Sequence, residues 1–335
     1  MRSNAGFARL HAALAVLTLA FAAFSLTVGQ FPLTLPQVAD ALAAMTPEGS
    51  PANQVIWSVR LPRVLTALFA GGALGLAGAS LQGVFRNPLV DPHIIGVTSG
   101  AAFGGTLAIV LGFSSPAMLC STFAFGLTAL ALVYGVAKMQ GRESRLALIL
   151  SGIILSGFFS ALVSLMQYMS DTEEVLPNIV FWLMGSFATA DWQKLAMLAV
   201  FVIAAGAVII ALRWRINLLA LDDADAKALG VNPGPLRLAV LLSCAVLVAA
   251  QVAVSGSIGW VGLVIPHISR MLCGADHRRL LPTAFWVGSI FMIAVDDLAR
   301  TLTQAEIPIG IITALLGAPI FAAMLIRARR RGTPL

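Results

Sequence analysis

Long uncharged stretches separated by short charged breaks are the feature that most restricts what this chain can fold into. No charged residue lies between Arg63 and Arg86, and the break at 86–92 leads into a second apolar stretch. In lipid, every backbone polar group must be bonded within a helix, and breaks must lie near water or protein. The pattern therefore predicts a bundle of membrane-spanning helices. Other charge-free stretches cover 10–39, 92–137, 146–170 and 238–269.

Composition agrees with this interpretation. The 335 residues are 59% hydrophobic and only 11% charged, with a mean hydropathy of +0.92. These values lie outside the soluble globular range. A helix needs about 20 apolar residues to cross the hydrocarbon core, so the longer stretches hold two spans each. We expect an all-α integral membrane protein of about ten transmembrane helices, with nine or eleven as the alternatives, and a half-helix or re-entrant segment at 175–190. The expected spans are 10–30, 63–84, 93–111, 116–138, 146–169, 195–212, 237–255, 258–273, 280–300 and 307–327.

The placement of Lys and Arg predicts the orientation. With the N-terminus in the cytoplasm, 17 of the 21 basic residues fall inside. The four outside are Arg60, Arg63, Lys194 and Arg300. Cytoplasmic loops carry the excess of Lys and Arg, so both termini are expected in the cytoplasm. The net charge of +6 then reflects membrane topology, with the lipid bilayer as a partner. The sequence has no basic stripe of the kind that binds nucleic acid.

A weak internal repeat suggests two inverted halves. Leu61-Pro62-Arg63 opens the second span and Pro235-Leu236-Arg237 opens the seventh; Pro92-His93 and Pro266-His267 match at the same offset. The two copies would enter from opposite sides. Spans 2–5 and 7–10 would therefore form an inverted repeat, a recurring design of transporters.

Ionisable residues near the ends of spans are candidates for function. Asp296 and Asp297 precede Arg300, and an intrahelical pair between Asp296 and Arg300 is the simpler explanation. His93 and His267 each follow a proline at an expected span boundary, where a local hydrogen bond is favoured over a metal or haem ligand. No catalytic, phosphate-loop or metal motif occurs, so no enzyme, cofactor or metal site is expected.

The inner loop at 217–234 predicts a short surface helix that docks a partner. Apolar side chains recur there at helical spacing, and acidic ones occupy the other faces. Because acidic residues disfavour an anionic lipid surface, a protein partner is favoured.

Several motifs resemble the FecCD-type permeases, the membrane subunits of type II ABC importers for iron-siderophores, haem and cobalamin. The resemblance covers nearly the whole chain in order. The motifs are Arg60-Leu61-Pro62-Arg63, Arg86-Asn87-Pro88-Leu89 with Asp91-Pro92 and Gly96, the run 259–267, the run 276–282, the run 296–300, Pro308-Ile309-Gly310 and Gly317-Ala318-Pro319.

The resemblance implies one transmembrane permease domain over 1–335, with a coupling-helix loop at 213–236. It also implies a homodimer or a pair of similar permeases in the bacterial inner membrane, two cytoplasmic ATPase subunits and a periplasmic binding protein. Arg60, Arg63 and Arg300 match arginines that dock the binding protein. Asp297 departs from the family pattern. Residues matched to ATPase coupling are Leu218, Leu221, Asp222, Asp225, Ala228, Leu229 and Gly230. Those matched to the cytoplasmic gate are Asn87, Pro88, Leu89, Val90, Glu143 and Ser144.

The expected function is thus import of a metal chelate such as haem, a ferric siderophore or cobalamin by alternating access, driven by ATP hydrolysis in a separate subunit. The pathway is expected along spans 5, 8 and 10. A proton-coupled secondary transporter is the alternative, and it would need an acid or a histidine in the middle of a span.

Overall fold

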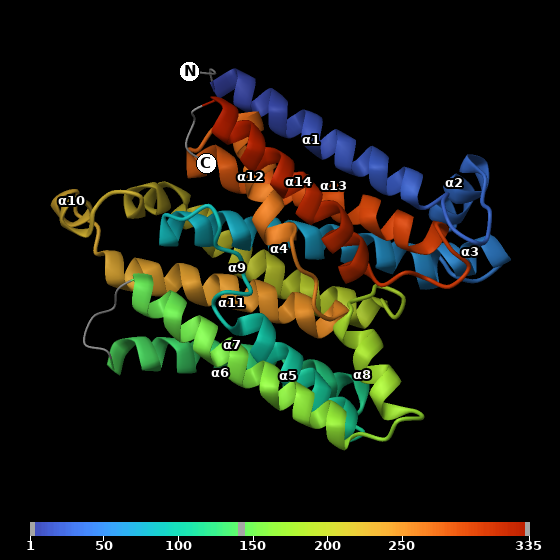
Figure 1. Cartoon of the computed structure of the whole chain (residues 1–335). Helices are drawn as coiled ribbons and strands as arrows, with labels where there is room; N and C mark the ends of the chain where they lie inside the picture. The colour runs from blue at the N-terminus through green and yellow to red at the C-terminus, as the bar shows by residue number, and fades with distance from the viewer. Residues whose placement is uncertain (1–3, 140–144, 332–335) are drawn as a thin grey trace.

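The computed structural model describes residues 4–139 and 145–331, and no strand occurs among them. The long helices run roughly parallel to one axis (Figure 1). Seven are long and apolar enough to cross a membrane, and three shorter apolar helices complete the expected ten. The long ones include α1 (Asn4–Ser25), α6 (Ser115–Met139), α7 (Arg145–Met169), α9 (Trp192–Leu219), α11 (Pro233–Ser255) and α13 (His277–Thr301). The seventh is a continuous helix of α3 (Pro51–Val55), a π-helical turn at Ile56–Arg60 and α4 (Leu61–Phe85).

Most of the remaining helices are short. Two of the three shorter apolar helices are α5 (Val97–Val110) and α12 (Val261–Cys273). The third is the apolar part, Ile309–Met324, of the longer helix α14 (Ile309–Arg331). α8 (Val175–Leu183) has nine residues, which agrees with the half-helix expected at 175–190. α2 (Leu35–Ala44) and α10 (Asp223–Ala228) lie at opposite ends of the bundle (Figure 1).

α4 forms the centre of the bundle because glycines let its neighbours approach closely. A methyl group on Gly71 or Gly75 would clash with a backbone oxygen of α13, and one on Gly78 would clash with the backbone of Gly262 in α12. Small residues at this spacing are typical of helix contacts in membranes. The sequence pattern is therefore a packing motif.

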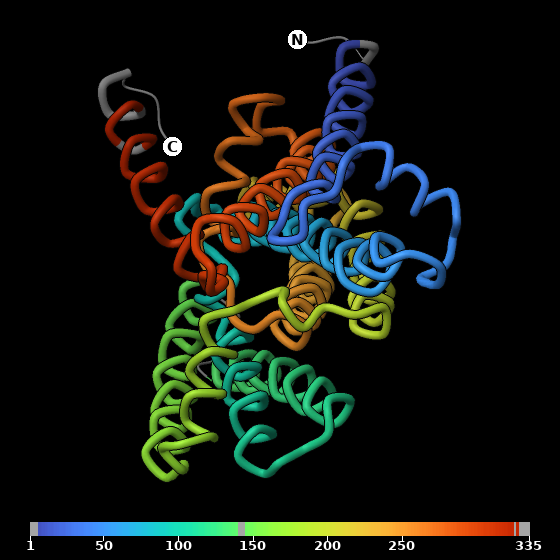
Figure 2. The backbone as a smooth tube through the Cα atoms, turned by 90° about the vertical axis from the view of Figure 1, so that its right-hand side faces the viewer, coloured from blue at the N-terminus to red at the C-terminus, as the bar shows by residue number. Residues whose placement is uncertain are grey.

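Viewed from one end, α5, α6 and α7 form one side of the bundle, and α1 and α13 lie on the opposite side (Figure 2). α5 and α6 pack closely, since a methyl group on Gly104 would lie 2.7 Å from Cβ of Phe125. Trp182 of α8 covers Gly105 of α5.

Several boundaries differ from the sequence expectations. Arg60 and Arg63 lie within helical backbone, because the helix begins at Pro51 and not in a basic turn. His93 lies in a turn before α5, and His267 lies inside α12, so neither opens a span. α9 continues to Leu219 and α11 begins at Pro233, which leaves a connection shorter than 213–236.

The start of α1, the end of α14 and α10 all lie at one end of the bundle (Figure 1). The matched arginines of the internal repeat, Arg63 and Arg237, bond to different carboxylates at opposite ends of the bundle. Arg63 bonds to α13 near its C-terminus, whereas Arg237 bonds to the beginning of α10. α4 and α11 therefore run in opposite directions, as an inverted repeat requires.

Candidate functional sites

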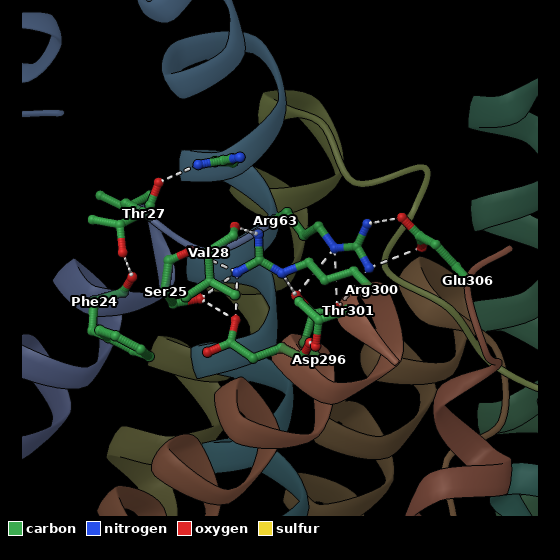
Figure 3. A network of polar contacts seen from close by, with 12 residues as sticks. Phe24, Ser25, Thr27, Val28, Arg63, Asp296, Arg300, Thr301 and Glu306 are labelled. Atoms are coloured by element: carbon green, nitrogen blue, oxygen red, sulfur yellow. Dashed lines mark hydrogen bonds and ion pairs between the residues drawn. The ribbon is translucent and has the colours of Figure 1, made fainter. Parts of the chain in front are cut away.

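A buried ion-pair network surrounds Arg63 (Figure 3), which lies in the first turn of α4. Its Nε and Nη2 donate to Oδ1 of Asp296 at 3.0 and 2.8 Å. Its Nη1 and Nη2 donate to the two carboxylate oxygens of Glu306 at 2.7 and 2.9 Å. Asp296 is only 1% exposed, whereas the Glu306 side chain is 31% exposed. Arg63 thus has a buried acid on one side and a partly exposed acid on the other.

Arg300 ties α13 to the end of α1. Its Nη1 donates to the Val28 carbonyl at 2.6 Å, and its Nη2 donates to the Ser25 carbonyl at 2.6 Å and pairs with Asp297. The Ser25 hydroxyl donates to the same Asp297 carboxylate at 2.6 Å. Arg60 lies nearby and donates to the Leu26 carbonyl at 2.6 Å. These bonds anchor α1 to the rest of the bundle.

The structure therefore brings Arg60, Arg63 and Arg300 together at one end, as the sequence predicted, but it buries all three side chains. Their role in docking a binding protein stays a prediction. The expected pair of Asp296 with Arg300 exists at 3.7 Å, a longer contact than the one Arg63 makes with Asp296. Burial of charge is costly without partners, so the arginines also hold the fold.

Sequence analysis missed Glu306 and Ser25 in this network. Glu306 lies in the loop between α13 and α14, and nothing in its local sequence marks it as a partner for a residue 243 positions earlier. A hollow of about 400 Å³ opens beside the network, and residues 300–304 with Gly29 and Gln30 line it.

The predicted coupling segment lies at the opposite end of the bundle (Figure 1). α10 has only six residues, with Asp222 before it and Leu229 after it. Ala226 is fully buried against the bundle, while Leu221 and Leu229 are 40% and 57% exposed. Leu218 falls in the last turn of α9, and Gly230 adopts a positive φ that ends the segment. The segment thus exposes two apolar side chains while Ala226 packs against the bundle.

Three arginines from different parts of the chain meet at Asp223, the first residue of α10. Nη2 of Arg145 and Nη2 of Arg237 lie 3.0 and 3.3 Å from the carboxylate of Asp223, and Nη2 of Arg86 lies 4.0 Å from it. Arg86 also pairs with Asp222 at 2.8 Å. The sequence pointed to Asp222 and Asp225 as coupling residues, and it gave no signal that Asp223 is the acid on which the arginines converge.

The predicted gate loop begins directly after this cluster. Arg86 ends α4 in a left-handed conformation, with φ 51°. Asn87 then closes a turn, because its side-chain oxygen accepts from the Leu89 N–H at 2.9 Å. Leu89 is 48% exposed, while Val90 is buried. Glu143 and Ser144, the other predicted gate residues, lie outside the described residues.

Two polar groups of α12 lie on one partly exposed face. His267 and Arg270 are three residues apart and half buried. Arg270 donates to the side-chain oxygen of Gln82 on α4, and its Nη1 has no partner among the described residues. This face carries a positive charge in the last turn of α12.

Proton coupling finds little support in the geometry. Asp296 and Asp297 are both engaged with arginines near the end of α13. Within 4–139 and 145–331, no group of three or more His, Cys, Asp and Glu side chains could hold a metal ion.

Comparison with known proteins places the chain in a family. The model of the FecCD transport family matches residues 17–327. The molybdate import system permease protein MolB of Haemophilus influenzae is 58% identical over 280 residues, which cover 84% of this chain and 83% of that protein. The hemin transport system permease protein HmuU of Yersinia pestis is 39% identical over 289 residues, which cover 83% and 86%.

A solved structure of an ABC transporter described as of the metal-chelate type, in an inward-facing conformation, has the same fold. Its TM-score is 0.87 at 53% identity, and the match covers 95% of this chain and 99% of that one. The relatives are named as permease proteins of import or transport systems. The chain is therefore a non-catalytic, multi-pass membrane permease of an ABC transporter, and it belongs to the FecCD transport family.

Proposed function

We propose that this permease imports a small oxyanion of the molybdate class. The observation that carries the proposal is the 58% identity to a molybdate permease over most of both chains. The cationic face of α12 supports it, because Arg270 has a guanidinium nitrogen without a partner among the described residues. Arg270 lies in the last turn of α12, and its guanidinium attracts an anion there.

Import of a metal chelate is the second candidate, and it was the expectation from the sequence motifs. It is supported by the haem permease at 39% identity and by the metal-chelate transporter that shares the fold. The exposed apolar face of α7, which includes Ile154 and Phe158, also suits a bulky ligand. The pathway would run along α7, α12 and α14 in both cases, between two copies of the chain.

Transport by the reconstituted system separates these candidates. The permease is placed in proteoliposomes with its ATPase and its binding protein, and uptake of labelled molybdate and of haem is measured with ATP inside. We expect ATP-dependent molybdate uptake and no haem uptake. Haem uptake alone would contradict the oxyanion proposal. Uptake by the permease alone, driven by a pH gradient, would contradict an ATP-driven importer of either substrate.

The same proposal assigns each end of the bundle to one side of the membrane. The end with α10 and the starts of α7 and α11 faces the cytoplasm and two ATPase subunits. The end with Arg60, Arg63 and Arg300 faces the periplasm and the binding protein. The excess of basic residues at the α10 end supports this orientation, with both termini cytoplasmic.

Docking of an acidic lobe onto Arg63 requires that Glu306 move aside, because Glu306 covers the outward side of the guanidinium. Glu306→Gln removes the competing charge while Asp296 still holds Arg63. A partly exposed pair is worth about 0–1 kcal/mol, so the affinity for the binding protein is expected to rise by up to about fivefold. Surface plasmon resonance on nanodiscs measures it.

Glu48→Gln is the matched control, since Glu48 is an exposed acid at the same end of the bundle. Its affinity for the binding protein is expected to equal that of the unmodified permease. A lower affinity of Glu306→Gln would show that the binding protein contacts Glu306 itself, and the docking assignment of Arg63 would then fail.

A further inference from the structure

Asp223 occupies a junction between the predicted coupling segment and the predicted gate. Its carboxylate is approached by Arg86, which ends α4 one residue before the gate loop, by Arg145 at the first residue of α7, and by Arg237 in the second turn of α11. One acid therefore connects α10 with three separate helices.

The end of α9 reinforces this junction. The Leu219 carbonyl accepts from Nε of Arg86 at 2.8 Å and from Nη2 of Arg145 at 3.4 Å. The two arginines thus hold the turn that leads from α9 into α10. The exposed side chains of Leu221 and Leu229 remain available to a partner on the outer surface of the same segment.

Charge makes the junction depend on Asp223. Three guanidinium groups gather there, and among the described residues the other nearby acid is Asp222, whose ion pair is with Arg86. Removing the charge of Asp223 takes away the carboxylate that Arg145 and Arg237 share and leaves the two cations close together, and like charges at short range repel. The arginines are then expected to separate, and α10 would lose its rigid attachment to α4 and α7.

We infer that Asp223 is a positioning residue that transmits motion from the ATPase to the cytoplasmic gate. A push on α10 moves Arg86, and with it the turn at Asn87, and moves Arg145, and with it the start of α7. This inference rests on the proposed function, because it assumes that α10 docks an ATPase. Asp223 acts through the arginines, and it touches neither the substrate nor ATP.

The test uses the assembled transporter in proteoliposomes and compares Asp223→Asn with Asp223→Glu. The readouts are the affinity of the ATPase for the permease, the rate of ATP hydrolysis, and the number of molecules imported per ATP hydrolysed. With Asp223→Asn we expect ATPase affinity within about twofold of the unmodified permease and at least a tenfold loss of import per ATP. Asp223→Glu, which keeps the charge, is expected to retain at least half of the import per ATP.

A second readout follows the gate directly. Leu89→Cys is labelled with a thiol reagent in a background that carries Cys120→Ser and Cys273→Ser. Labelling is expected to change with nucleotide when Asp223 is present and to become insensitive to nucleotide in Asp223→Asn. Asp40→Asn, an exposed acid on α2 at the other end of the bundle, serves as the control and should behave like the unmodified permease.

Two results would overturn the inference. One is unchanged import per ATP and unchanged nucleotide-dependent labelling in Asp223→Asn. The other is loss of ATPase binding in Asp223→Asn, which would make Asp223 a direct contact of the ATPase. Failure of the unmodified permease to bind any ATPase would instead refute the proposed function, so the two failures are distinguishable.

Discussion

Asp296→Ala is expected to destabilise the permease by about 3–5 kcal/mol, because it leaves a buried arginine without its buried partner. Asp296 is 1% exposed, and it accepts from Arg63 at 2.8 Å within the bundle. Arg300 also lies 3.7 Å from it. The free energy of unfolding, measured by titration with a denaturing detergent in mixed micelles, is expected to fall by this amount.

Glu306→Ala is the matched comparison, because it removes the other acid of the same arginine. The Glu306 side chain is 31% exposed, so water replaces it at Arg63, and the expected loss is about 1 kcal/mol or less. The double variant Arg63→Met with Asp296→Leu should recover much of the loss, since replacing a buried pair by apolar side chains is often nearly neutral. Equal losses for Asp296→Ala and Glu306→Ala would show that Asp296 does not carry the network.

Gly78→Ala is the second substitution for which a large effect is expected. The added methyl group would meet the backbone oxygen, carbonyl carbon and Cα of Gly262, and backbone cannot rotate out of the way. Overpacking costs about 1–3 kcal/mol, occasionally more, and this site is expected at or above the upper end. α4 and α12 would be forced apart, and the yield of folded permease and its unfolding midpoint would both fall.

Gly135→Ala provides the contrasting result. Gly135 lies on an exposed face of α6, and no atom would lie within 4 Å of its new methyl group. Alanine favours the helix over glycine by about 1 kcal/mol, so this variant is expected to be as stable as the unmodified permease or slightly more stable. If Gly78→Ala were also neutral in the same unfolding assay, the close approach of α4 and α12 would be wrong.

Much of the architecture followed from local sequence. The ten apolar helices and the half-helix at 175–190 were predicted. Lipid requires each crossing segment to satisfy its own backbone, so hydropathy over about 20 residues is sufficient to locate it. Boundaries were less accurate where helices extend beyond the apolar segment, as at Pro51 and Leu219.

The sites were only partly predicted. The sequence located Arg60, Arg63 and Arg300 at one end and the coupling segment at the other, because basic residues reveal sidedness. It predicted a partner only for Arg300, in Asp296, and the structure shows all three arginines buried and bonded. A side chain that needs a buried partner can find it anywhere in the chain, and no spacing rule specifies which acid that will be.

What the sequence determined by itself is which segments of this chain can cross a membrane, since hydropathy acts segment by segment. Only the tertiary structure decided which charges meet. Arg63 finds Asp296 and Glu306 at separations of 233 and 243 residues, and Asp223 gathers Arg86, Arg145 and Arg237 from three helices. The physical reason is that a buried ion needs a counterion within a few ångströms, and packing of distant helices alone brings the two to that distance.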